Sequence, residues 1–272
     1  MLPLVYLASK RSEARTQRLL QRAQTAERLA EIGTLTGGLA HEIKNPLSTV
    51  GLNIQLLEED LGHLVNASGG DAALSEEIGR ISRRFASLAK ETSRLKTILE
   101  DFLRFAGRMK LDLQLTDLNE LAQEITEFFK PQTDTASITL RHQLEPNLPW
   151  VRVDHGVLKQ AILNLLINAY QAMIDAKNNH LAAGGNDELL IRTERVKGEG
   201  EDRVQLHITD TGPGIDQETL GKIFQPYFSS KRGGTGLGLP TSRRIVEEHG
   251  GELTLISAVG KGTEFTISLP MG

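Results

Sequence analysis

The 272-residue chain contains no cysteine. This excludes disulfide bonds, thiolate metal sites and a cysteine nucleophile, and it is compatible with a reducing compartment. Aromatic residues make up only 4% of the chain, so we expect a core of Leu, Ile, Val and Ala. The formal net charge of −4 shows no excess of positive charge. We therefore expect no nucleic-acid partner, because nucleic-acid-binding domains are usually strongly basic.

The sequence also lacks a long hydrophobic run. Its N-terminal apolar stretch, residues 2–8, is far shorter than the roughly 20 residues that span a bilayer. Basic residues follow this stretch rather than precede it, unlike in a signal peptide. Two interpretations stay open, an ordinary helix start or the inner end of a membrane anchor outside this chain. We expect a cytoplasmic protein or the cytoplasmic portion of a membrane-anchored protein.

Residues 12–62 form one long helical pattern, with a good heptad seam from Leu29 onward. A polar turn at 66–71 separates it from a second pattern, in which apolar residues from Ile78 to Phe102 recur at steps of three and four. These two patterns predict an all-α helical hairpin. Because one hairpin cannot bury both apolar stripes, we expect two copies to form a dimeric four-helix bundle.

After about Gly107 the pattern changes to short strands mixed with helices. Strands are predicted at 111–115, 137–143, 188–196, 203–209, 253–257 and 263–269. Helices are predicted at 118–130, where Pro131 ends the helix, at 155–176 behind the N-cap Asp154, and at 241–249 before two glycines. This order predicts an α+β two-layer sandwich with helices on one face of a sheet.

A histidine with chemically suitable neighbours lies inside the first long helix. His41 falls at heptad position b, towards solvent, and Glu42 beside it can accept a proton from the imidazole or orient it. Asn45 lies one turn further along on the same face, and Pro46 should bend the helix there. A zinc-protease motif is excluded because its second histidine would stand at position 45. An ordinary solvated histidine remains the alternative.

The helix predicted at 155–176 carries Gln160, Asn164 and Asn168 at four-residue spacing. Buried amides need polar partners, and Mg²⁺ with phosphate oxygens would suit the asparagine oxygens. The alternative is a set of core amides bonded to a neighbouring loop.

Two further segments favour a ligand. Asp210 leaves a strand into a Gly-Pro-Gly turn, where it can accept a hydrogen bond from a ligand amino group, although a plain turn has the same pattern. The stretch 224–239 combines Lys231 with several glycines, which allow close backbone approach to phosphates. It fits neither the dinucleotide fingerprint nor the Walker loop, because position 239 is Leu. A flexible surface loop is the alternative.

Taken together and in this order, the motifs resemble the sensor histidine kinases of two-component systems, over about residues 30–270. The H box corresponds to 41–47, the N box to 164–172, the first glycine box to 210–215, the F box to 224–228 and the second glycine box to 234–238. The run 226–231 and the pair 171–172 are most similar to the nitrogen-regulation subclass. The resemblance implies a helical linker at 1–30, a dimerisation and histidine phosphotransfer domain at 31–107, and a catalytic domain at 111–272 with the Bergerat ATP-binding fold of the GHKL superfamily.

The resemblance also implies a protein-histidine kinase, a phosphotransferase with ATP and Mg²⁺ as cofactors. His41 would accept the γ-phosphate with Glu42 as its acid–base partner, and then pass it to an aspartate in the receiver domain of a response regulator. Asn45 would orient water for dephosphorylation of that regulator. Asn168 with Asn164 would hold Mg²⁺. The implied nucleotide contacts are Asp210, Gly212, Gly214 and Thr263 at the adenine, and Lys231, Gly234, Thr235, Gly236, Leu237 and Gly238 in a lid over the phosphates.

One departure narrows the choice within the superfamily. The hydrolysing members carry a Glu four residues before the magnesium-binding Asn, and here that position is Asn164, a poor general base. This favours transfer to His41 over ATP hydrolysis. A nucleotide-binding scaffold without kinase activity, and a GHKL ATPase or serine kinase without histidine chemistry, are the alternatives. Nothing before residue 30 is large enough to be a ligand-binding domain, so an upstream sensor or anchor would lie elsewhere.

Overall fold

The computed structural model describes residues 43–57, 59–61, 71–107, 109–178, 187–197, 202–229, 231 and 234–272. These residues fall into two compact units, divided between Ala106 and Gly107. His41, Glu42 and the expected linker at 1–30 lie outside the described residues.

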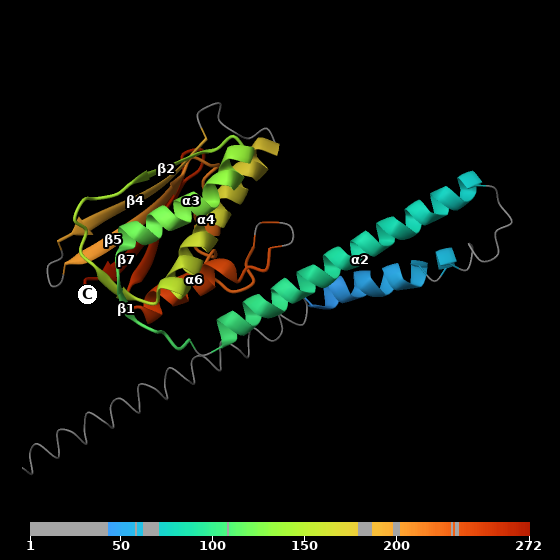
Figure 1. The fold of residues 1–272 in the computed structure, drawn as a ribbon, viewed down its shortest axis with the longest axis horizontal. Helices are drawn as coiled ribbons and strands as arrows, with labels where there is room; N and C mark the ends of the chain where they lie inside the picture. Colours follow the sequence, from blue (N-terminus) through green and yellow to red (C-terminus); the bar gives the residue numbers. More distant parts are fainter. Residues whose placement is uncertain are drawn as a thin grey trace, which may run out of the picture. The chain divides into compact units, whose positions relative to one another are not determined.

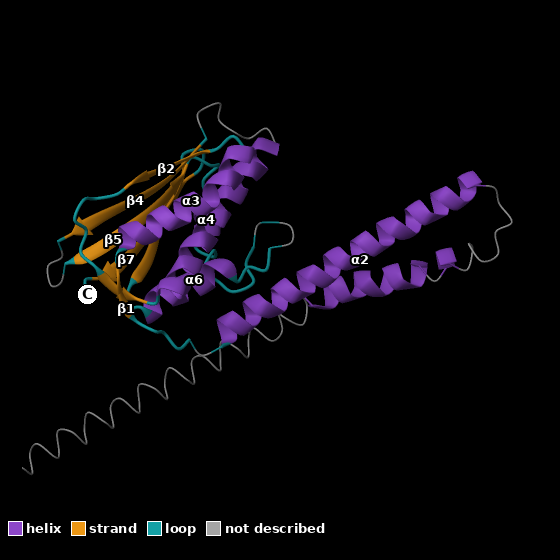
Figure 2. Ribbon diagram, viewed as in Figure 1, coloured by secondary structure: helices purple, strands orange, loops and turns teal. Residues whose placement is uncertain are grey.

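The first unit contains helical residues 43–57 and 59–61 and the long helix α2 (Asp71–Ala106), shown in Figures 1 and 2. The two helical segments contact each other through polar groups. Asn53 Nδ2 donates to Ser87 Oγ at 3.5 Å, and Arg84 Nε lies 2.8 Å from Asp60 Oδ2. The predicted helical hairpin is confirmed, with α2 extending beyond the predicted pattern at both ends.

The second unit is built on a five-stranded sheet with strand order β2-β4-β5-β7-β6. β2 pairs with β4 in parallel, and the other pairs are antiparallel. A separate antiparallel pair joins β1 to β3. The strands are β1 (Gln114–Thr116), β2 (Thr139–Gln143), β3 (Val151–Val153), β4 (Glu188–Val196), β5 (Arg203–Asp210), β6 (Glu252–Ala258) and β7 (Gly262–Pro270).

The long helices of this unit lie on one face of the large sheet (Figure 2). They are α3 (Leu118–Thr135), α4 (His155–Asn178) and α6 (Gly238–Glu248); α5 (Gln217–Leu220) is a single short turn. The core between the layers is mainly aliphatic, with fully buried Leu165, Ile191 and Leu206 among its members. The predicted two-layer sandwich is confirmed. Asp154 caps α4 as predicted, because its Oδ1 accepts from the backbone N–H of Val157 at 3.1 Å.

The predicted end of α3 at Pro131 is wrong, because the helix continues to Thr135. Proline removes one backbone donor, but Pro131 is exposed, so the lost bond falls on the solvent side. On the opposite side Thr133 is fully buried and its hydroxyl donates to the Lys130 carbonyl at 2.9 Å. Packing therefore holds the last turn, and the chain leaves the helix at Ser137, which has a φ of 54°.

Other boundaries also differ from the prediction. α6 begins at Gly238 rather than at 241, because both the backbone N–H and the hydroxyl of Thr241 donate to the Leu237 carbonyl. The strand predicted from 111 begins at 114, since the Asp112 N–H bonds to the Asp154 side chain instead of a strand. The short strand β3 and the turn α5 were not predicted.

Candidate functional site

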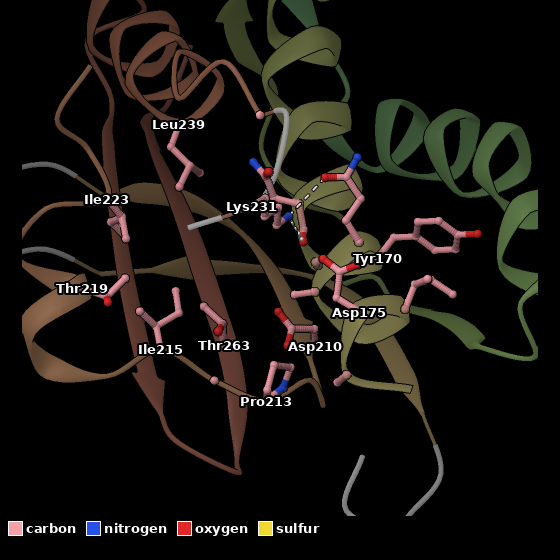
Figure 3. A pocket seen from close by; sticks show the side chains of 18 of the residues that line it. Tyr170, Asp175, Asp210, Pro213, Ile215, Thr219, Ile223, Lys231, Leu239 and Thr263 are labelled. Atoms are coloured by element: carbon pink, nitrogen blue, oxygen red, sulfur yellow. Dashed lines mark hydrogen bonds between the residues drawn. The ribbon is translucent and has the colours of Figure 1, made fainter. Parts of the chain in front are cut away.

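A cavity of about 1090 Å³ opens in the second unit (Figure 3). Its walls come from α4, from the loop after β5, from β7 and from the glycine-rich stretch before α6. Among the predicted site residues, the following line it: Asn168, Asp210, Gly214, Lys231, Gly234 and Thr263. The fold thus brings together residues that lie up to 95 positions apart in the sequence.

Asp210 ends β5 and is 4% exposed. Burial raises the pKa of its carboxyl group to about 6, while hydrogen bonds from the backbone N–H groups of Gly212 and Thr263 and the charge of Lys231 act in the opposite direction. The Gly212 N–H donates to Oδ1 at 2.8 Å. At neutral pH the group is mainly an anion, and it is an acceptor in the cavity wall for a ligand N–H.

The loop after β5 is fastened to the β6–β7 hairpin. The backbone N–H of Gly260 donates to the Pro213 carbonyl at 2.7 Å, and that of Ile215 donates to Ser257 Oγ at 2.9 Å. Gly214 has a φ of 71°, and a Cβ there would lie 2.0 Å from the Ala258 carbonyl oxygen. Only glycine fits this position without displacing backbone.

Thr263 stands beside Asp210 because β7 pairs with β5 in that register. It is 6% exposed, and its hydroxyl lies 2.9 Å from Ser257 Oγ. Ser257 was not predicted as a site residue. Nothing in its local sequence distinguishes it, because its role depends on the pairing of β6 with β7.

The two asparagines of α4 that were predicted as site residues have different surroundings. Asn168 is half-buried and lines the cavity. Asn164, one turn earlier, is not among the lining residues. Its Nδ2 donates to Ser242 Oγ at 2.7 Å, and a Cβ on Gly238 would lie 2.8 Å from its Oδ1. Asn164 thus fixes the close approach of α4 to the start of α6.

Lys231 reaches from the glycine-rich stretch back to α4. Its Nζ donates to the Asn168 carbonyl oxygen and to Gln171 Oε1, both at 3.1 Å (dashed lines in Figure 3). Burial lowers the pKa of the ammonium, and the negative charges of Asp175 and Asp210 oppose this shift. Gln171 and Asp175 were not predicted as site residues. Their spacing of three and seven from Asn168 places them on the same helix face, and that spacing was the available signal.

The rest of the glycine-rich stretch packs against protein. Gly236 has a φ of 65°, and a Cβ there would lie 2.5 Å from the Tyr227 carbonyl carbon. The Tyr227 N–H donates to the Gly236 carbonyl at 3.2 Å, and Leu237 is fully buried. Thr235 Oγ1 accepts from the Leu237 N–H at 3.4 Å. In this structure Gly212, Thr235, Gly236, Leu237 and Gly238 therefore shape the cavity's surroundings rather than line it.

The catalytic residues predicted in the first unit are only partly described. Asn45 is exposed on the helix, whereas His41 and Glu42 lie outside the described residues. In the described part of the chain, no three or more His, Cys, Asp or Glu side chains are grouped so that they could hold a metal ion. Within the same residues, none of the helices combines the length and the apolar content needed to cross a membrane.

Two family models match the chain. The His Kinase A (phospho-acceptor) domain matches residues 31–108, and the Histidine kinase-, DNA gyrase B-, and HSP90-like ATPase matches residues 153–272. The second unit with its cavity thus belongs to an ATP-binding class of domains, and a phospho-acceptor domain precedes it.

Similar proteins and structures agree with these two matches. The sensor histidine kinase ZraS of Escherichia coli (strain K12) is 34% identical over 259 residues, which cover 94% of this chain and 50% of ZraS. The signal transduction histidine-protein kinase AtoS of the same strain is 30% identical over 268 residues, which cover 98% of this chain and 39% of AtoS. The crystal structure of histidine kinase ThkA in complex with response regulator protein TrrA superposes with a TM-score of 0.65 at 26% identity, and it covers 90% of this chain and 64% of that one.

The chain belongs to the sensor histidine kinases, which confirms the resemblance inferred from the sequence motifs. It spans about half the length of the curated ZraS relatives that it matches.

Proposed function

We propose that this protein is an ATP-dependent protein-histidine kinase of a two-component system. It autophosphorylates on His41 and passes the phosphoryl group to an aspartate in the receiver domain of a response regulator. The observation that carries this proposal is that one chain joins a phospho-acceptor domain match containing position 41 to a cavity of the ATP-binding class.

The cavity supports adenine recognition at Asp210. A buried anionic carboxylate accepts the hydrogen bond of an exocyclic amino group, and Thr263 lies beside it in the sheet. Gly212 and Gly214 shape the loop, and apolar side chains such as Ile215 line the same region for the flat face of a base. Lys231 and the segment beginning at Gly234 supply positive charge and backbone N–H groups towards the phosphates.

Asn168 is the proposed magnesium ligand, together with Asn164. Hard oxygen donors suit Mg²⁺, and the absence of a carboxylate cluster in the described residues is compatible with an ion held largely by phosphate oxygens. Asn168 lines the cavity beside Lys231. Asn164 lies one turn earlier, outside the cavity lining, and its Nδ2 is bonded to Ser242, so only its oxygen would be available to the ion. The bound ion would offset negative charge on the phosphates.

The proposed transfer needs few protein groups. A neutral ring nitrogen of His41 forms a bond to the γ-phosphorus, the bond from that phosphorus to the ADP oxygen breaks, and Glu42 takes the imidazole proton. Position 164 offers an amide and no carboxylate general base for water. This supports transfer to histidine over hydrolysis.

The partners in this proposal are a second copy of the chain and a response regulator. The hairpin exposes a series of large apolar side chains that a four-helix bundle would bury: Leu47, Leu52, Ile54, Leu61, Ile78, Phe85, Leu99 and Leu103. Asn45 is exposed on the helix, and in this proposal it orients water for dephosphorylation of the regulator. A cytoplasmic location and an upstream sensor or membrane anchor complete the proposal.

The test is transfer of label from γ-labelled ATP with Mg²⁺ to the full chain and then to a receiver domain. We expect label that is labile in acid, stable in base and absent from His41→Gln. Label that persists in His41→Gln, or ATP turnover without a phosphoprotein, would contradict the proposal. Asn45→Ala should keep autophosphorylation and lose regulator dephosphorylation, and loss of both together would count against the role of Asn45.

A further inference from the structure

The ammonium of Lys231 is held by neutral groups only. Its two hydrogen bonds go to a backbone carbonyl, that of Asn168, and to the side-chain amide oxygen of Gln171. None of the ion pairs among the described residues involves Lys231. The nearby carboxylates of Asp175 and Asp210 act on it through space and oppose the effect of burial on its pKa. The hydrogen bonds that position the ammonium therefore come from neutral acceptors, and no direct ion pair within the described part of the chain occupies its donors.

This arrangement leaves binding capacity for an anion. A lysine ammonium has three N–H donors, and the two bonds to Asn168 and Gln171 use two of them. Lys231 lines the cavity, so the third donor and the positive charge can act on a negatively charged ligand there. Glu at position 171 would have the same shape and reach, but its charge would cancel that of Lys231.

Gln171 is well placed to fix the lysine. It lies three residues after Asn168 on α4, so both acceptors of Lys231 belong to one helix turn. Lys231 itself comes from the glycine-rich stretch, and a long lysine side chain has many rotamers. A hydrogen-bond acceptor on α4 restricts the rotamers of Lys231 before the ligand binds. Binding then costs less side-chain entropy.

We propose that Gln171 is a positioning residue for the nucleotide phosphates: it holds Lys231 in place at the cavity through a neutral acceptor that adds no negative charge. This inference rests on the proposed nucleotide-binding function and adds a specificity for phosphate groups to it. Gln171 acts through Lys231, so its contribution to binding should disappear when Lys231 is removed.

The test is a double-mutant cycle on the full chain, measured by calorimetry with a non-hydrolysable ATP analogue and Mg²⁺. We expect Gln171→Leu to weaken binding about 3–10-fold and Lys231→Ala to weaken it about 10-fold or more. The double variant should bind no more weakly than Lys231→Ala alone, because coupled groups are not additive. Adenosine, measured by competition, should bind all variants equally. Gln123→Leu on an exposed position of α3 is the matched control.

The variant Gln171→Glu tests whether the neutral charge of the side chain matters or only its shape. A purely structural role would tolerate this isosteric exchange, whereas the proposal predicts weaker analogue binding that falls further as the carboxylate ionises. Additive losses in the cycle, an equal loss for adenosine, or full retention of binding in Gln171→Glu would overturn the inference. Autophosphorylation is measured separately on the unsubstituted chain. If that chain binds the analogue but does not label His41, the result contradicts the kinase proposal alone. If it binds no analogue, the result contradicts both the kinase proposal and the role of Gln171.

Discussion

The two units of this chain are stabilised in different ways. Among the described residues, three large apolar side chains are buried in the hairpin unit, namely Leu57, Ile98 and Phe105, whereas thirty apolar side chains are buried in the sandwich unit. The hairpin also exposes eight large apolar residues along its short described length. The sandwich thus has the core of an independent domain, while the hairpin presents a surface that needs a partner. This difference fits a division of labour in which one unit holds the nucleotide and the other assembles.

The largest effect should come from a charge on the exposed apolar face of the hairpin. Phe85 is 58% exposed on α2 in the single chain. Burying such a side chain contributes about 1.5–3 kcal/mol, and a symmetric dimer would bury it twice. Phe85→Glu should therefore shift the chain from dimer to monomer in analytical ultracentrifugation, with the sandwich still folded. Lys90→Glu on the exposed side of the same helix is the control, and an unchanged dimer in Phe85→Glu would contradict this role.

A substitution in the sandwich core should act differently. Leu165 of α4 is fully buried in the core of the sandwich. Leu165→Ala should lower the free energy of unfolding of this unit by about 2–5 kcal/mol, through lost burial and a cavity. Chemical denaturation should show a loss that does not depend on protein concentration. A loss that vanishes at high concentration would mean that the sandwich, too, depends on association.

The ionised carboxylate of Asp210 should lower the stability of the folded unit while it supports nucleotide binding. Its folded pKa of about 6 lies above the ordinary value of 3.8, so ionisation destabilises the folded state as the pH rises through that range. The nucleotide-free unit should be more stable at pH 5 than at pH 8, by about 1.4 kcal/mol from this group. Asp210→Asn should remove that pH dependence in urea titrations, raise stability at pH 8 and reduce nucleotide affinity. A variant that keeps the same pH dependence would show that another group causes it.

The smallest effect should come from the hydroxyl that links the β6–β7 hairpin to the loop after β5. Ser257 accepts from the Ile215 N–H and lies beside Thr263. Ser257→Ala should cost about 1 kcal/mol of stability and weaken nucleotide binding by a comparable amount, because the loop loses a backbone partner. Thr254→Ala, on an exposed position of the same strand, provides the comparison. Equal effects of both substitutions in a thermal-shift series would argue against a specific role of Ser257.

The sequence predicted much of the sandwich because its local signals agree with its packing. The strand at 188–196 matches β4, and Asp154 caps α4 as its position suggests. The wrong end at Pro131 arose where tertiary burial of Thr133 outweighed a local helix-breaking signal. A prediction was correct where the contacts that fix an element lie close together in the sequence, and it was wrong where those contacts come from distant parts of the chain.

The residues of the candidate site also divide into those with a local sequence signal and those that depend on distant contacts. Asp210 stands out in the sequence because an acidic residue precedes a Gly-Pro-Gly turn, and the structure places it in the cavity. The hydrogen bond from Lys231 to Gln171 joins residues sixty positions apart and has no local signal on the lysine side. Asn164 was grouped with Asn168 by helical spacing and by the family resemblance, whereas its bond to Ser242 depends on how α6 packs against α4.

The most direct test of the central claim is to locate the phosphoryl group by mass spectrometry after incubation with ATP and Mg²⁺, with handling at neutral or basic pH. The account predicts one phosphoryl group on the imidazole of His41 in the unsubstituted chain. It predicts none in His41→Gln and a strong reduction in Asp210→Asn, which leaves the hairpin unchanged and alters only the cavity. A phosphoryl group on a serine or threonine, or full modification of His41 in Asp210→Asn, would contradict it.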